Sequence, residues 1–221
     1  METSPSFSRL LRTSGFVIFI VLFFDQWLKY WVKTHLYLGE DFPLIGRWSF
    51  IHFTENYGMA FGMEFGGSNG KVFLSLFRII ASAGIAWYIL RLCRRGAPLL
   101  TVLCFSFIFA GAVGNIIDSA FYGMIFSDSA DGLATLFPVE GGYAGFLHGR
   151  VVDMLYFPLF SGVFPDWFPV WGGESFLFFR PIFNIADASI TCGVLLYLFF
   201  HRKMTDGENV KDAAASASVE D

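Results

Sequence analysis

Two pairs of asparagine and aspartate stand in apolar stretches where ionisable side chains are costly. Asn115 and Asp118 end the run GAVGNIID, and Asn184 and Asp187 recur with the same spacing in FNIADASI. Residues three positions apart project from one face of a helix. A further aspartate, Asp153, lies in the apolar run VVDMLYF. Each carboxyl in such a segment costs roughly a few kcal/mol on membrane-insertion scales, which favours a functional role for it.

Two of these carboxyls, Asp153 and Asp187, are suited to hydrolysis. Two close carboxylates in a dry site cannot both ionise easily, because like charge and desolvation raise the pKa of one of them. The protonated carboxyl can polarise a peptide carbonyl, while the ionised one takes a proton from a water held between them. No H-E-x-x-H, G-x-S-x-G or Walker sequence competes with this interpretation. The sequence therefore predicts an aspartic hydrolase without a cofactor or metal.

The elements that must position these groups are apolar. Of the 221 residues, 55% are hydrophobic, 19% aromatic and only 15% charged, and the mean hydropathy is +0.55. These values exclude a disordered or ordinary soluble chain. Four segments approach the roughly 20 residues that a helix needs to cross a bilayer; they are 14–34, 72–90, 97–118 and 182–200. We expect a mainly α membrane protein, with residues 1–203 forming a single four-helix domain.

The positions of Lys and Arg predict the orientation of the spans. Basic residues flank the predicted inner ends, namely Arg9, Arg12, Arg91, Arg94, Arg95, Arg202 and Lys203. Both termini are then cytoplasmic, and residues 35–71 and 119–181 lie outside. No A-x-A cleavage pattern follows the first span, which favours a retained anchor. The tail, residues 204–221, holds the entire net charge of −4 and is predicted to be disordered, so the body shows no basic excess for nucleic acid.

Asp25, Lys29 and Arg78 also fall in the predicted spans. Asp25 and Lys29 are four residues apart and can neutralise one another on one helix face. One interpretation is an ion pair that makes the helix tolerable, with Lys29 extending its ammonium outward; the other is a role in the site. Arg78 has the same two interpretations, contacting the outer headgroups or pairing with an acidic residue of the site.

The outer segments have the pattern of short strands and turns. Residues 47–53 (RWSFIHF) alternate loosely, and residues 126–179 are rich in Gly, Pro and aromatics, as expected of loops on a membrane surface. The three cysteines show no C-x-x-C spacing, so neither a disulfide framework nor a zinc site is indicated.

Five motifs in order resemble the lipoprotein signal peptidases, also called signal peptidase II. They are DQWLK from residue 25, ENYGMAFG from 55, GAVGNIID from 111, GRVVDM from 149 and FNIADASI from 183. Each motif alone is a weak signal, whereas the ordered set across residues 25–190 is specific.

The resemblance implies a four-span aspartic endopeptidase of the bacterial inner membrane. Such an enzyme removes the signal peptide from diacylglyceryl-modified prolipoproteins, cleaving before the lipid-bearing cysteine at the outer leaflet. Asp153 and Asp187 fall on its catalytic positions. Its other motif positions fall on Asp25, Lys29, Asn56, Gly58, Asn115, Asp118, Asn184 and Ala186. The implied fold has a small extracytoplasmic sheet in residues 36–66 and a long outer loop in 126–181. The expected partners are lipid-modified prolipoproteins and membrane phospholipid, with the protein acting as a monomer.

This chain departs from the family pattern at two motif positions. The family continues its G-N-x-x-D motif with Arg, whereas this chain has Ser119, and Arg150 or Arg78 is the candidate substitute. Met59 stands where a small residue is common. Two other hypotheses stay open: a non-catalytic lipid- or ion-binding protein or small transporter that uses the buried acids, and a degenerate peptidase turned binding protein.

Overall fold

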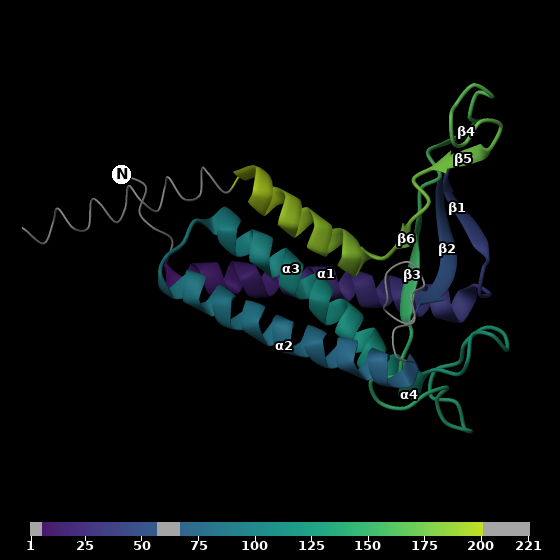
Figure 1. Ribbon diagram of the computed structural model, residues 1–221. Coiled ribbons are helices and arrows are strands. Elements are labelled where there is room, and N and C mark those ends of the chain that lie inside the picture. The colour runs from purple at the N-terminus through teal and green to yellow at the C-terminus, as the bar shows by residue number, and fades with distance from the viewer. Residues whose placement is uncertain (1–5, 57–66, 201–221) are drawn as a thin grey trace, which may run out of the picture. The chain divides into compact units, whose positions relative to one another are not determined.

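The structure is a computed structural model that describes residues 6–56 and 67–200 (Figure 1). It divides into two compact units. The first comprises Met1–Gln26, Val72–Ile117 and Ile185–Asp221, and the second comprises Trp27–Lys71 and Asp118–Asn184. Whether residues 1–203 behave as a single domain stays a prediction. The predicted disorder of residues 204–221 falls outside the described residues.

Apolar helices make up most of the first unit. The helices are α1 (Phe7–His35), α2 (Gly67–Arg94), α3 (Leu99–Ile117) and a shorter one at Ile185–Phe200; α1 beyond Gln26 and α2 before Val72 belong to the second unit. Two short helices, η2 (Asp118–Tyr122, a π-helix) and α4 (Gly123–Ile125), follow α3. α1, α2 and the stretch Leu99–Ile125 are long and apolar enough to cross a membrane. Many of their large apolar side chains are exposed, including Phe73 (73%) and Ile80 (72%), as expected of surfaces that face lipid. The chain is therefore a multi-pass membrane protein.

A helix is found at each of the four predicted apolar segments, with shifted ends; three are long enough to span a membrane, and the fourth is shorter, so its crossing stays a prediction. α1 begins seven residues earlier than predicted, because the helix continues through the polar residues ahead of the apolar run. The fourth helix begins at Ile185 rather than 182, which corrects the prediction. Ile182–Phe183 form strand β6 instead, since their backbone pairs with Leu155 and Tyr156 of β3.

Small residues allow the helices of the first unit to approach closely. A Cβ on Gly111 of α3 would lie 2.1 Å from the carbonyl oxygen of Ala186, and one on Gly193 would lie 2.6 Å from that of Cys104. Ser14 and Ser106 join α1 to α3 through a buried hydrogen bond of 2.7 Å between their hydroxyls. The small residues of the GAVG run thus lie where α3 contacts the neighbouring helix.

Replacing Gly111 by Ala should destabilise the first unit. The new methyl group overlaps backbone of the neighbouring helix, which cannot move aside as a flexible side chain would, and overpacking of this kind costs about 1–3 kcal/mol. Thermal unfolding in detergent measures the loss. The matched control is Gly84→Ala, because a Cβ at Gly84 on α2 meets nothing within 4 Å. Equal midpoints for the two variants would contradict the close packing.

The second unit contains a four-stranded antiparallel sheet in the order β1-β2-β3-β6. Its first three strands are β1 (Asp41–Ile45), β2 (Ser49–Asn56) and β3 (Val151–Tyr156). A separate hairpin pairs β4 (Phe160–Val163) with β5 (Ser175–Phe178). The strand predicted from the alternation at 47–53 is confirmed as β2. The sheet implied for residues 36–66 is confirmed only in part, because two of its strands come from distant sequence: β3 pairs with the second edge of β2, and β6 pairs with β3.

Candidate active site

Asp153 occupies β3, a central strand of the sheet, and is 4% exposed. Its two carboxylate oxygens accept hydrogen bonds from two amide side chains. Asn56 at the end of β2 donates to Oδ2, and Asn184, next to β6, donates to Oδ1 at 2.7 Å. Asn184 also donates to the carbonyl oxygen of Val152 at 3.3 Å. Antiparallel pairing thus brings together an aspartate and two asparagines that the sequence singled out.

Asp187 lies in the first unit, in the first turn of the helix Ile185–Phe200, where the helix dipole favours a negative charge. The amide of Asn115 on α3 donates to its Oδ1 at 2.8 Å. Spacing along the chain pairs Asn115 with Asp118 and Asn184 with Asp187. In the structure Asn115 also donates to Asp187 and Asn184 to Asp153, because a neighbouring element supplies partners that spacing along a helix does not indicate.

Asp25 holds the start of the helix that carries Asp187. It is fully buried on α1, and its Oδ1 accepts the backbone N–H of Ala186 at 2.8 Å. The first N–H groups of a helix have no partner within the helix, so this bond acts as a cap. Gln26 donates to Oδ2 of Asp25 and to the carbonyl of Gly114. A Cβ on Gly114 would lie 2.8 Å from Oδ2 of Asp25, which explains the glycine.

Lys29 is fully buried, and its ammonium lies 2.8 Å from Oδ2 of Asp118. The interpretation in which Lys29 extends outward is therefore wrong: the Asp118 carboxylate compensates the buried charge. Oδ2 of Asp118 also accepts the backbone N–H of Val152 at 3.2 Å, one residue before Asp153. The Lys29–Asp118 pair thus fixes the β3 backbone beside the candidate catalytic aspartate.

The other residues that the sequence singled out lie in different parts of the structure, and two of them are not described by it. Ala186 is fully buried and donates the capping N–H. Gly58 and Met59 lie outside the described residues. Arg78 is half-buried on α2, in the first unit. Ser119, where the family carries Arg, is buried on η2, and its carbonyl accepts the N–H of Gly149 at 2.9 Å.

Besides Lys29 and Asp118, the second unit contains another group of charged side chains, which the sequence alone does not indicate as a group. Lys33 donates to Glu55 and, at 2.6 Å, to the Ser129 hydroxyl. Arg150 donates to the second oxygen of Glu55 at 2.7 Å and binds both oxygens of Asp128, at 2.9 and 2.6 Å. We name Lys33, Glu55, Asp128 and Arg150 the Glu55 cluster. The spacing of Lys33, one helical turn after Lys29, was the available signal.

An aromatic ring completes the surroundings of the Glu55 cluster. The guanidinium carbon of Arg150 lies 4.5 Å from the Tyr143 ring centroid, and the Lys33 ammonium lies 4.9 Å from it. Burial raises the pKa of the Tyr143 hydroxyl, which accepts the backbone N–H of Arg150 at 2.7 Å. The hydrogen bond to Asp128 raises the pKa of Arg150 above its usual value. Arg150 thus pairs with two carboxylates of the second unit, and its substitution for the family arginine stays a prediction.

Acid should weaken the bond between Asp128 and Arg150. The guanidinium of Arg150 lowers the pKa of Asp128 from 3.8 to about 2, so its contribution to stability is present above about pH 4 and is lost as the pH falls through about 2. Thermal unfolding between pH 4 and pH 2 should therefore show a shallower decline for Asp128→Asn than for the wild-type protein. The effect is small and screened by salt, because the Asp128 side chain is 30% exposed. Identical slopes would contradict it.

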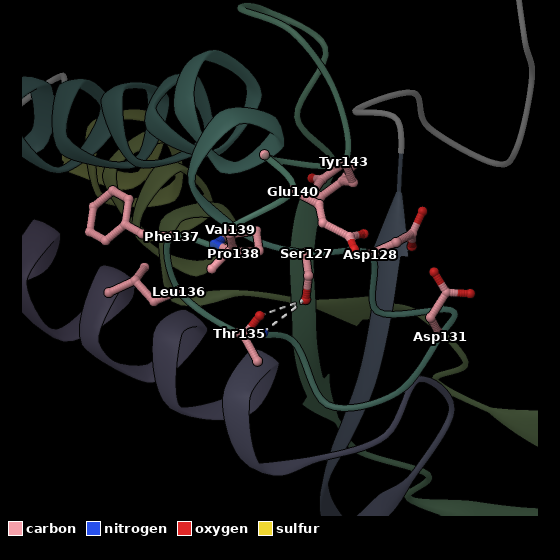
Figure 2. A pocket seen from close by; sticks show the side chains of 11 residues that line it. Ser127, Asp128, Asp131, Thr135, Leu136, Phe137, Pro138, Val139, Glu140 and Tyr143 are labelled. Carbon is pink, nitrogen blue, oxygen red and sulfur yellow. Dashed lines mark hydrogen bonds between the residues drawn. The ribbon is translucent and has the colours of Figure 1, made fainter.

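Asp128 and Tyr143 also line a cavity of about 660 Å³ formed by residues 127–143 (Figure 2). Figure 2 shows the carboxylates of Asp128, Asp131 and Glu140 around it, with the Ser127 hydroxyl bonded to Thr135. Neither Asp153 nor Asp187 lines this cavity. The cavity is therefore a different site from that of the two candidate catalytic aspartates.

Comparison with known proteins identifies the family. Residues 17–202 match the family model described as signal peptidase (SPase) II. A lipoprotein signal peptidase of Porphyromonas gingivalis is 52% identical over 183 residues, which cover 82% of this chain and 79% of that protein. One of Amoebophilus asiaticus is 36% identical over 189 residues, covering 84% and 76%. A solved structure described as a bacterial membrane enzyme is 25% identical with a TM-score of 0.57, covering 88% of this chain and 90% of that one.

The motif residues, the membrane helices and these matches agree. The chain belongs to the signal peptidase II family and is therefore a protease of the class that removes signal peptides from prolipoproteins.

Proposed function

We propose that this protein is an aspartic endopeptidase that cleaves diacylglyceryl-modified prolipoproteins immediately before the lipid-bearing cysteine, with Asp153 and Asp187 as the catalytic carboxylates. The observation that carries the proposal is that a buried amide binds each of these aspartates. Asn56 and Asn184 bind Asp153 in the second unit, and Asn115 binds Asp187 in the first. Fixed orientation is what a carboxylate needs to act as a general base or acid on one water.

The covalent chain supports joint action of the two aspartates. Asn184 binds Asp153, and Asp187 follows Asn184 by three residues. Three residues of chain span at most about 11 Å.

In the proposed reaction, the ionised carboxylate takes a proton from water, and the water oxygen attacks the scissile carbonyl carbon. The protonated carboxyl donates a hydrogen bond to the carbonyl oxygen, which becomes negative in the tetrahedral intermediate. Collapse breaks the C–N bond, and a proton passes from a carboxyl to the leaving nitrogen. The products are a signal peptide ending in a carboxylate and a new amino terminus on the lipidated cysteine.

The remaining features of the proposal concern place and partners. The catalytic aspartates lie at the outer leaflet of the bacterial inner membrane, and both termini are cytoplasmic, as the flanking Lys and Arg predict. The substrates are lipid-modified prolipoproteins, and membrane phospholipid surrounds the monomeric enzyme. Apolar helix surfaces suit a substrate that carries two acyl chains and an apolar signal helix.

Cleavage by the detergent-purified protein tests this function. The substrates are a diacylglyceryl-modified prolipoprotein and the same chain without lipid, and mass spectrometry identifies the products. We expect release of the signal peptide from the lipidated substrate only, with the lipidated cysteine as the new amino terminus. Equal cleavage of both substrates, or cleavage at another bond, would contradict the proposed specificity. Ion flux into vesicles without any cleavage would favour a transporter.

A further inference from the structure

The Glu55 cluster lies on the opposite face of the sheet from the Asp153 site. Glu55 and Asn56 are neighbours on β2, and successive side chains of a strand point to opposite faces. Glu55 therefore meets Lys33 and Arg150 on one face. Asn56 meets Asp153 on the other face.

β3 repeats this arrangement. Arg150 immediately precedes β3, and Asp153 lies within β3, three residues after Arg150. Because side chains alternate between the faces of a strand, an odd separation places these two on opposite faces. In the register of the two strands, Glu55 pairs with Val152 and Asn56 pairs with Val151. The cluster thus joins β2 to the start of β3 directly behind the hydrogen bond between Asn56 and Asp153.

The two oxygens of Glu55 are divided between two cations. Oε1 binds the ammonium of Lys33 on α1, and Oε2 accepts from Arg150 at 2.7 Å. The Glu55 side chain is 2% exposed and that of Lys33 is fully buried. A rotation of β2 that moved Asn56 would separate at least one of these buried ion pairs. Such a separation is costly because it leaves a charge without compensation.

We propose that Glu55 is a positioning residue, which holds Asn56 in place to orient the Asp153 carboxylate through its ion pairs with Lys33 and Arg150. This inference rests on the proposed function. It assigns a role in cleavage to Lys33 and Glu55, which meet on the face of the sheet opposite Asp153. It also gives Arg150 a role other than replacing the arginine absent at Ser119.

The test must separate orientation from stability. The double variant Lys33→Met/Glu55→Leu removes one cation and one anion together and leaves the Asp128–Arg150 pair intact. Apolar replacement of a complete buried ion pair is often neutral for stability. Glu55→Gln is the second variant, since it keeps the volume and removes the charge. The matched control is Asp41→Asn on β1, which neutralises the exposed carboxylate that contacts His52 on the same sheet.

Cleavage of the lipidated prolipoprotein is then measured for these variants, for Asn56→Ala, and for the triple variant that combines Asn56→Ala with the double change. We expect the double variant to unfold near the wild-type temperature, yet to lose about tenfold or more in kcat with little change in KM. That loss corresponds to a charge-assisted hydrogen bond. In the Asn56→Ala background the double change should lower kcat little further, because both act through one bond.

Three results would overturn the inference. The first is wild-type kcat in a stable double variant, and the second is wild-type kcat in Glu55→Gln. The third is a triple variant whose loss equals the product of the separate losses, because the cluster would then act independently of Asn56. All three presuppose cleavage by the wild-type protein in the same assay. If the wild-type protein fails to cleave, the proposed function falls, and this inference falls with it.

Discussion

Replacing Asp153 by Asn should abolish cleavage of the lipidated prolipoprotein while the protein still folds. The amide keeps the shape of the carboxyl but can neither take a proton from water nor carry negative charge. Losing a general base that acts as one unit with its partner lowers kcat on the order of 10⁴-fold or more. The assay is the initial rate of signal-peptide release, followed by mass.

Two further variants on the same sheet show how large the loss of activity in Asp153→Asn should be by comparison. Asn184→Ala removes the 2.7 Å hydrogen bond but leaves the carboxylate, so its loss should be far smaller than that of Asp153→Asn. Asp41→Asn, remote in the register of the same sheet, should cleave at the wild-type rate. An Asp153→Asn variant that retains a rate similar to that of Asn184→Ala would remove Asp153 from the catalytic role.

Lys29→Met should produce the largest loss of stability among single substitutions in the second unit. Without the ammonium, the fully buried Asp118 carboxylate loses the cation at 2.8 Å. Breaking one side of a buried ion pair costs about 3–5 kcal/mol, which lowers the unfolding temperature on the order of 10 °C for a chain of this size. Thermal unfolding in detergent measures the change.

A paired substitution distinguishes charge from packing at this position. In Lys29→Met/Asp118→Asn both members of the pair lose their charge, and the oxygen of the introduced amide can still accept the backbone N–H of Val152. We expect the double variant to recover most of the lost stability. If it is as unstable as Lys29→Met, the cost comes from the lysine stem rather than from the loss of the cation beside the Asp118 carboxylate.

The sequence indicates the candidate catalytic aspartates better than the residues that bind them. Asp153 and Asp187 stand out because carboxyls in apolar runs are costly, and the structure places each against an asparagine amide. The amides also stand out, yet helical spacing assigns each to the aspartate nearest in sequence. Asn184 bonds to Asp153, 31 residues away, and Asn115 to Asp187, 72 residues away. Helical spacing fixes a face but not what a neighbouring element brings to it.

The elements that sequence analysis misses depend on long-range pairing. The sequence of β3 indicates only an apolar interfacial run, because its burial comes from β2 and β6 rather than from its own alternation. The Glu55 cluster cannot be predicted from local sequence patterns for a similar reason. Glu55 and Arg150 are 95 residues apart, and the register of two strands brings them together. Local patterns predict the helices well, because a span is defined by its own composition.

The two-aspartate mechanism is tested most directly by the single-turnover rate of cleavage of one lipidated prolipoprotein. The rate is measured for the wild-type protein, Asp153→Asn and Asp187→Asn, and thermal unfolding verifies that each is folded. The account predicts signal-peptide release by the wild-type protein and none above background from either variant. A folded Asp153→Asn or Asp187→Asn that cleaves at the wild-type rate would contradict the two-aspartate mechanism. The other informative result is a folded wild-type protein that cleaves nothing while a known lipoprotein signal peptidase cleaves the same substrate. It would support the hypothesis of a degenerate peptidase, in which Ser119 in place of the family arginine causes the loss of activity.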